Sequence, residues 1–244
     1  MKPFLLLATR AEDEAADAEY QAFLDHGGLA PEQLRRVRME SGPLGDVDLD
    51  DYSGIITGGG PFNFSDAPVL KTPVQRRVES EIFALLDEAV ERDFPFFGAC
   101  YGIGTLGAHR GAEIDRTYGE PPGPVTVELQ PAAADDPLLA GMPESFAAYV
   151  GHKEAVRKLP DDAVLLASSA GCPVQMFRVK QNLYATQFHP ELDFPGIELR
   201  IRVYKSYGYF PADEAEAVTE RSRAVEVTHP MRILRNFVES YRAG

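Results

Sequence analysis

The sequence is poor in cysteine and in positive charge. It has 244 residues, two of them cysteines, and 24 lysines and arginines stand against 38 aspartates and glutamates. Two cysteines do not predict a disulfide framework, so we expect a cytoplasmic protein in a reducing compartment. The formal net charge of −14 excludes the broad basic surface that nucleic acids need, and it disfavours an anionic membrane as a partner. Arginines cluster locally, and we interpret these clusters as solvated helix or edge faces: Arg35, Arg36 and Arg38; Arg76 and Arg77; Arg200 and Arg202.

Long apolar runs are also missing. No stretch approaches the ~20 apolar residues of a membrane-spanning helix. The apolar run at the start is too short for a signal peptide and is followed at once by acidic residues, so it predicts a first strand at residues 4–9. A hydrophobic content of 44% suffices for one sizeable core, and we expect a single domain over residues 1–244. No metal or other cofactor is expected, because no His/Cys/Asp cluster has metal-site spacing; the unassigned histidines are His26, His109 and His229.

A cysteine between two glycines is the central motif. Residues 94–99 are an apolar run that predicts a buried strand, residues 98–102 read GACYG, and the small residues of 103–109 favour a helix. A strand, a sharp turn and a helix with a nucleophile at the turn is the pattern of a nucleophile elbow. Glycines two residues either side relieve clashes at a strained turn, and the helix N-terminus stabilises a thiolate. The simpler interpretation is a buried structural cysteine.

A run of three glycines ends an earlier strand. Residues 52–57 predict a strand, residues 58–60 are glycine, and residues 74–90 form an amphipathic pattern that leads into the strand before Cys100. A strand, a helix and a strand with short connections predict a right-handed crossover and a parallel sheet. Both glycine-rich turns then lie at the carboxyl ends of strands, where open α/β sheets bind ligands. A flexible turn at 58–60 is the simpler alternative.

The second half predicts an antiparallel portion and a histidine site. A proline-rich break at 121–124 precedes short strands at 125–129, 146–150, 164–167, 174–179 and 183–188. The last strand ends in the residues QFHPE at 187–191. Residues two apart in an extended chain point the same way, so Glu191 can accept a ring N–H of His189 and leave the other nitrogen for a thiol. Taken alone, the motif is as compatible with an ordinary loop.

Together these motifs resemble those of class I glutamine amidotransferases. The matching segments, in the order of that family, are residues 57–61, 98–102, 151–156 and 187–191, and the start of the last helix at 228–230 fits the end of the domain. The resemblance implies a flavodoxin-like three-layer αβα sandwich. Its central sheet would be mostly parallel, with a smaller antiparallel portion.

The resemblance also implies a glutaminase half-reaction. Cys100 would attack the side-chain amide of glutamine to form a thioester, Glu191 would orient His189, and His189 would transfer protons. The ammonia would pass to a separate synthetase subunit, since no synthetase domain is attached. The resemblance also implies an oxyanion hole formed by the backbone N–H of Tyr101 and that of Gly59 or Gly60. The residues that it implies for substrate binding are Gly104, Val150, Gly151 and His152.

Three departures from the family pattern bear on the substrate. Gly104 stands where the family usually has glutamine, which removes an amide and is expected to enlarge the pocket. Glu154 replaces the family's aspartate, a milder change. The connection at about 192–228 is longer than usual, and we expect a helical insertion that forms a lid or an oligomer contact. Its aromatic residues between 204 and 210 are interpreted first as packing and second as the lining of a lid.

Two alternatives to a glutaminase remain. The first is a hydrolase of a γ-glutamyl peptide or conjugate, which Gly104 and the free-standing chain support. The second is a binding or regulatory module on the same scaffold, which Gly104 permits and the joint presence of Cys100, His189 and Glu191 opposes. The small-molecule partner is therefore glutamine or a γ-glutamyl compound, and a homo-oligomer is possible.

Overall fold

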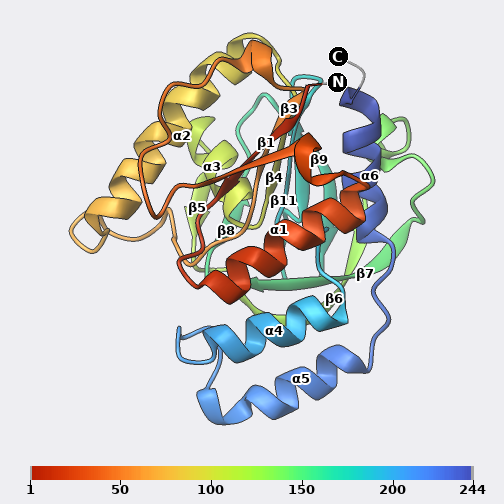
Figure 1. Ribbon diagram of the computed structural model, residues 1–244. Coiled ribbons are helices and arrows are strands. Elements are labelled where there is room, and N and C mark those ends of the chain that lie inside the picture. Colours follow the sequence, from red (N-terminus) through yellow and green to blue (C-terminus); the bar gives the residue numbers. More distant parts are fainter. Residues whose placement is uncertain (1, 243–244) are drawn as a thin grey trace.

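A computed structural model describes residues 2–242 of the chain, and its centre is one nine-stranded sheet (Figure 1). Neighbouring strands from β2 to β11 are parallel, and those from β11 to β7 are antiparallel. The expected α/β class with a parallel centre is confirmed, and the antiparallel strands extend the same sheet. In spatial order the strands are β2 (Leu34–Arg38), β1 (Phe4–Ala8), β3 (Gly54–Thr57), β4 (Phe96–Ala99), β11 (Leu183–Thr186), β10 (Met176–Val179), β9 (Ala163–Ser169), β6 (Glu120–Leu129) and β7 (Ser145–His152).

Helices cover both faces of the sheet and make three layers. Helices α1 (Asp13–Gly27) and α6 (Pro230–Tyr241) lie on one face, and α2 (Pro73–Glu91) and α3 (Tyr101–His109) lie on the other (Figure 1). The alternation of β1 explains this, because Phe4 and Leu6 join the first core whereas Leu5 and Leu7 join the second. Within residues 2–242, no helix is long and apolar enough to cross a membrane.

The antiparallel half differs from expectation in two places. The proline-rich run at 121–124 does not break the chain: β6 passes through it, and the register with β7 shifts between Glu120 and Gly123. Prolines are tolerated there because the ladder is already irregular. A second, two-stranded sheet of β5 (Glu113–Asp115) and β8 (Ala155–Lys158) has no counterpart among the predicted strands.

Residues 192–228 form two helices at the end of the sheet. Helices α4 (Phe194–Tyr204) and α5 (Ala215–Arg223), blue in the lower part of Figure 1, pack on each other. They share a small core of Tyr149 from β7 with Ile197, Ile201 and Val218. The Tyr149 hydroxyl ties this core to α5 by donating to the Ser222 carbonyl over 2.9 Å. This small core holds α4 close to the strand ends.

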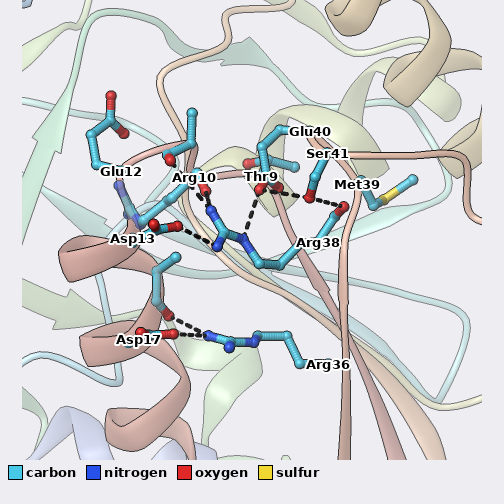
Figure 2. Close-up of polar contacts among 12 residues, drawn as sticks. Thr9, Arg10, Glu12, Asp13, Asp17, Arg36, Arg38, Met39, Glu40 and Ser41 are labelled. Carbon is cyan, nitrogen blue, oxygen red and sulfur yellow. Dashed lines mark hydrogen bonds and ion pairs between the residues drawn. The ribbon is translucent and has the colours of Figure 1, made fainter.

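The arginines of β2 fasten the start of α1. Figure 2 shows Arg38 donating to the carboxylates of Asp13 and Glu40 and to the backbone carbonyl of Arg10, while Arg36 donates to Asp17. These arginines lie on an edge strand, as expected, but the bonds give them partners on α1 and in the segment before it. The loop between β1 and α1, which carries Arg10, is therefore fixed in place.

Candidate active site

Cys100 lies on a strained turn between β4 and α3. Its φ of 54° and ψ of −93° fall in a region that non-glycine residues rarely adopt, and such a conformation costs on the order of 1–3 kcal/mol. The backbone N–H of Cys100 donates to the Thr186 carbonyl over 2.8 Å, so the turn is anchored to the strand beside β4. The nucleophile elbow predicted from the sequence is therefore present in the structure.

The two flanking glycines are required by backbone contacts. A Cβ on Gly98 would lie 2.7 Å from the carbonyl carbon of Gly102. A Cβ on Gly102 would lie 3.2 Å from the Thr57 carbonyl oxygen at the end of β3. Real Cβ atoms do not approach backbone as closely as the first of these distances, so Gly98 permits the sharp return of the chain into α3.

His189 and Glu191 follow β11 and form a buried pair. The Nδ1 atom of His189 lies 2.8 Å from Oε1 of Glu191, and the His189 backbone N–H donates to the Tyr149 carbonyl over 2.9 Å. Glu191 is fully buried and His189 is 5% exposed. The i, i+2 spacing thus places the two side chains together, and Nδ1 is the nitrogen that faces the carboxylate.

Charge around the His189 ring favours its protonated form. Burial alone lowers the pKa of His189, but Glu191 and then Cys100 outweigh it and raise the pKa to about 9. Burial alone would raise the pKa of Glu191. The charge and the hydrogen bond of His189 outweigh burial and lower the pKa of Glu191 to about 2. An imidazolium that faces a carboxylate on one side and interacts with a thiol on the other is the arrangement of a cysteine hydrolase.

Side chains from other parts of the chain pack closely against the three glycines after β3. A Cβ on Gly58 would lie 2.6 Å from Oε2 of Glu19, and one on Gly59 would lie 2.8 Å from Cε1 of His189. A Cβ on Gly60 would overlap the hydroxyl of Thr9. The alternative of a flexible turn therefore does not describe these residues, since a side chain from a distant part of the sequence occupies the space next to each glycine.

One of the oxyanion-hole candidates is already occupied. The backbone N–H of Gly59 donates to Oε1 of Glu19 over 3.2 Å, and the same oxygen accepts from Nε of Arg10 over 2.9 Å. Gly60 lines the space beside Cys100, and Tyr101 is the first residue of α3, where N–H groups have no partner within the helix. The geometry therefore favours Gly60 and Tyr101 over Gly59 as donors.

Cys100 lies where two cavities meet. The first, which we call the Glu154 cavity, encloses about 360 Å³ of empty space including its open mouth. Its polar lining includes Gln187 and Tyr101, whose Oε1 and hydroxyl are buried and have no hydrogen-bond partner within residues 2–242. Three of the residues predicted to bind substrate line this cavity: Gly104, Gly151 and His152.

The expected enlargement of the pocket at Gly104 stays a prediction, and the structure shows which side chain limits it. The ring of Phe64 takes the space, because a Cβ on Gly104 would lie 3.1 Å from it. Phe64 stacks on Tyr101 with ring centroids 5.3 Å apart. The Glu154 carboxylate holds this loop by accepting the N–H groups of Phe64 and Ser65, each over 2.7 Å. The glutamate that replaces the family's aspartate thus shapes the cavity wall.

The second cavity, which we call the Arg200 cavity, encloses about 400 Å³ including its open mouth. Its lining includes Cys100, His189, Arg10 and Arg200, and Val150 of the predicted substrate segment lies here. The interpretation of Arg200 as part of a solvated face is wrong, since the residue is 6% exposed. Tyr209 lines both cavities, so one of the aromatic residues after α4 belongs to the surroundings of the nucleophile.

A second group of cysteine, histidine and glutamate lies beside the Glu154 cavity. Candidate ligand atoms of Glu120, His152 and Cys172 lie within 4.8 Å of one another. Both ring nitrogens of His152 are engaged, Nδ1 with the Glu154 carbonyl and Nε2 with Glu120, and Cys172 donates to the Val174 carbonyl. Burial raises the pKa of Cys172 to about 12. These hydrogen bonds give the group a structural role and do not suit a metal ion.

Sequence reasoning missed several residues around Cys100. Arg10 and Glu19 are distant in the sequence from every motif, Arg200 follows the QFHPE motif without belonging to it, and only the folded chain brings the three to the site. The one available signal was weak: charged residues on apolar helix faces, such as Glu19, which is fully buried. Gln187 was visible as part of the QFHPE motif but carried no assignment of its own.

Comparisons with known sequences agree with the geometry. The family model for "Glutamine amidotransferase class-I" matches residues 32–194. The chain is 31% identical over 180 residues to a glutamine-hydrolysing GMP synthase subunit of Thermoplasma volcanium, which covers 70% of this chain and 82% of that protein. It is 32% identical over 140 residues to the glutamine-hydrolysing GMP synthase of Lactobacillus delbrueckii subsp. bulgaricus, covering 57% of this chain and 24% of that protein.

Solved structures show the same fold. A glutamine amidotransferase from Thermotoga maritima superposes with a TM-score of 0.77 at 19% identity, covering 100% of both chains. A glutamine amido transferase from Methylobacillus flagellatus gives 0.73 at 20% identity, covering 100% of this chain and 95% of that one. With the family model matching most of its length, the chain belongs to the class I glutamine amidotransferase family.

Proposed function

We propose that the chain hydrolyses the side-chain amide of glutamine and supplies the ammonia to a separate synthetase subunit. The observation that carries the proposal is the buried pair of His189 and Glu191 beside Cys100 on its strained turn. Strain and burial of this kind persist where function requires them. The same geometry opposes a binding module without chemistry, since nothing in such a module requires this arrangement.

The reaction follows the roles of the three side chains. The Cys100 thiolate attacks the amide carbon, and the backbone N–H groups of Gly60 and Tyr101 stabilise the oxyanion, each by about 3 kcal/mol. His189 gives its Nε2 proton to the departing ammonia and leaves a thioester on Cys100. Water then loses a proton to His189 and cleaves the thioester, which releases glutamate. Glu191 keeps the Nδ1 proton in place throughout.

The Glu154 cavity is proposed to hold the glutamyl part of the substrate. The unpartnered Oε1 of Gln187 and hydroxyl of Tyr101 are available to the polar groups of an amino acid. His152 acts by position, because its ring bonds to Glu120 and to the Glu154 carbonyl hold the segment after β7 at the rim. Gly104, Val150 and Gly151 are proposed as the walls that contact the substrate chain.

The partner is proposed from the relatives. The relative from Thermoplasma volcanium is named as a subunit of GMP synthase. The match to the GMP synthase of Lactobacillus delbrueckii covers about a quarter of that longer protein. A separate subunit that accepts ammonia follows from this correspondence. We further propose that the chain is a single domain over 1–244 in which residues 192–228 are an insertion and act as a lid, because Tyr209 lines both cavities that meet at Cys100.

The test is ammonia release from L-glutamine together with covalent labelling by a diazoketone analogue of glutamine, read by intact mass. Cys100→Ala should abolish both signals. Cys172→Ser is the matched control, since Cys172 is buried and hydrogen-bonded outside the two cavities, and it should keep both signals. Labelling that survives in Cys100→Ala, or an unlabelled wild type without ammonia release, would contradict the proposal.

A further inference from the structure

The Arg200 cavity lies on the side of Cys100 from which the leaving group departs. His189 lines this cavity and, among the described residues, does not line the Glu154 cavity. In the proposed reaction His189 gives a proton to the leaving nitrogen, so that nitrogen must lie on the His189 side. Ammonia is about the size of a water molecule, which occupies about 30 Å³ of the liquid. The Arg200 cavity is also lined by charged side chains, Arg10 and Arg200, which ammonia does not need.

Arg200 is buried in this cavity wall without hydrogen-bond partners. Its Nε, Nη1 and Nη2 atoms all lack an acceptor within residues 2–242. The nearest carboxylate oxygens are Oε1 of Glu19 at 3.7 Å and Oε1 of Glu191 at 4.0 Å from Nη2, beyond hydrogen-bond distance. Both oxygens are already engaged, the first by Arg10 and Gly59 and the second by His189, whereas Oε2 of each carboxylate is buried and accepts no hydrogen bond within residues 2–242.

Among the charged groups around the cavity, Arg200 has only long ion pairs, with Glu19 at 3.7 Å and Glu191 at 4.0 Å, and it makes no hydrogen bond within residues 2–242. Arg10 pairs with Glu19 at 2.9 Å, and protonated His189 pairs with Glu191 at 2.8 Å. Burial and then the charge of Arg10 hold the pKa of Arg200 below its ordinary value. A buried guanidinium whose donors make no hydrogen bond is destabilising, and a planar anion with two oxygens matches those donors.

We infer that the Arg200 cavity binds the carboxylate of an amine leaving group, so that γ-glutamyl amides of amino acids or similar carboxylate-bearing amines are substrates besides glutamine. The inference rests on the proposed amide chemistry. The Cys100 sulfur forms a bond to the γ-carbonyl carbon as the C–N bond breaks, and the nitrogen keeps the electron pair and takes the proton from His189. Water then releases glutamate, so one water is consumed for each amide cleaved.

The test compares γ-glutamylglycine with γ-glutamylethylamide, which differ in the carboxylate. Wild type should favour γ-glutamylglycine in kcat/KM by about 10- to 100-fold, the range of a hydrogen-bonded charge. Arg200→Gln should bring the ratio close to one, and Arg200→Lys should keep part of it because the charge remains. Arg202→Gln removes an exposed arginine of the same helix and should leave the ratio as in wild type.

The outcomes separate the two proposals. Cys100-dependent turnover of glutamine with equal rates for both amides would overturn the inference and leave the proposed function standing. Absence of Cys100-dependent cleavage of glutamine and of both amides would overturn both. If Arg200→Gln does not fold, the wild-type ratio and the Arg200→Lys ratio still decide, since a wild type that does not favour γ-glutamylglycine contradicts the inference.

Discussion

At Cys100 the strained backbone exists because two glycines remove side chains that would block it. Gly98→Ala places a methyl group 2.7 Å from the Gly102 backbone, which cannot move without opening the turn. We expect a loss of about 1–3 kcal/mol in the free energy of unfolding, together with loss of diazoketone labelling. Gly42→Ala is the control, because no heavy atom lies within 4 Å of its added Cβ, and it should change stability little. Urea unfolding of both variants checks the prediction, and an unaffected Gly98→Ala would refute it.

The carboxylate of Glu191 determines the state of the His189 ring. Glu191→Gln removes the strongest of the interactions that raise the pKa of His189, so burial should dominate and the pKa should fall below about 9. Turnover should drop by about 10²- to 10⁴-fold, because the amide does not hold the required tautomer. NMR titration of the ring and steady-state kinetics measure the two effects. A variant whose His189 pKa is unchanged would show that the pair does not control protonation.

Among the elements, the segment that follows α4 is the one that we propose as a lid over the nucleophile. Tyr209 lines both cavities, and Lys153 holds the segment by lying 4.5 Å from the centre of the Tyr209 ring and donating to the Tyr207 carbonyl. Cys100 itself is only 9% exposed. Tyr209→Ala should therefore increase the rate at which iodoacetamide alkylates Cys100 several-fold. This increase corresponds to the loss of the packing free energy of about one aromatic contact.

Tyr209→Phe keeps the ring and is the matched control for this prediction. Its alkylation rate should stay close to that of wild type. Equal rates in Tyr209→Ala and wild type would mean that this segment does not shield the thiol, and the proposal of a lid over residues 192–228 would fail.

Elements with a strong local pattern could be predicted from the sequence. The five apolar residues of β1 and the amphipathic face of α2 gave the parallel centre of the sheet, and the motif at 98–102 gave the turn at Cys100. The small strand pair of β5 and β8 was missed because three or four residues carry too little pattern. The strand through residues 121–124 was missed because prolines normally end a ladder.

The Arg200 cavity also escaped prediction, and the physical reason is a different one. A charged residue on a helix is usually solvated, and nothing local distinguishes buried Arg200 from exposed Arg202 two residues later. Its burial depends on how α4 packs against the small core with Tyr149. Likewise, the fit of Phe64 against Gly104 is a contact between distant segments.

At the scale of the whole molecule, the pair of His189 and Glu191 makes stability depend on pH. The pKa of His189 rises from 6.5 to about 9 on folding, so its contribution is complete below about pH 6.5 and is lost as the pH rises to about 9. The pKa of Glu191 falls from 4.5 to about 2, so its contribution is complete above about pH 4.5 and is lost as the pH falls to about 2. The pair should stabilise the fold most between about pH 4.5 and 6.5.

Urea unfolding of wild type and His189→Gln between about pH 6.5 and pH 9 measures the contribution of the histidine. The difference in unfolding free energy between the two proteins should narrow from about pH 6.5 to about pH 9. His229→Gln, which changes an exposed histidine at the start of α6, should show a difference that does not vary in this way. A constant difference for His189→Gln would mean that the ring does not gain a proton on folding.

The parallel pairing of β4 with β11 has a consequence for how reactivity arises. These neighbouring strands are joined in register, Phe96 opposite Leu183 and Ala99 opposite Thr186, although all the antiparallel strands separate them along the chain. Pairings between distant segments form late, because a long loop must close before any contact compensates for the lost entropy. During synthesis Cys100 leaves the ribosome well before His189, so we expect the emerging chain to carry an ordinary thiol. Reactivity then appears only when the last parallel strand is in place, as a product of completed folding.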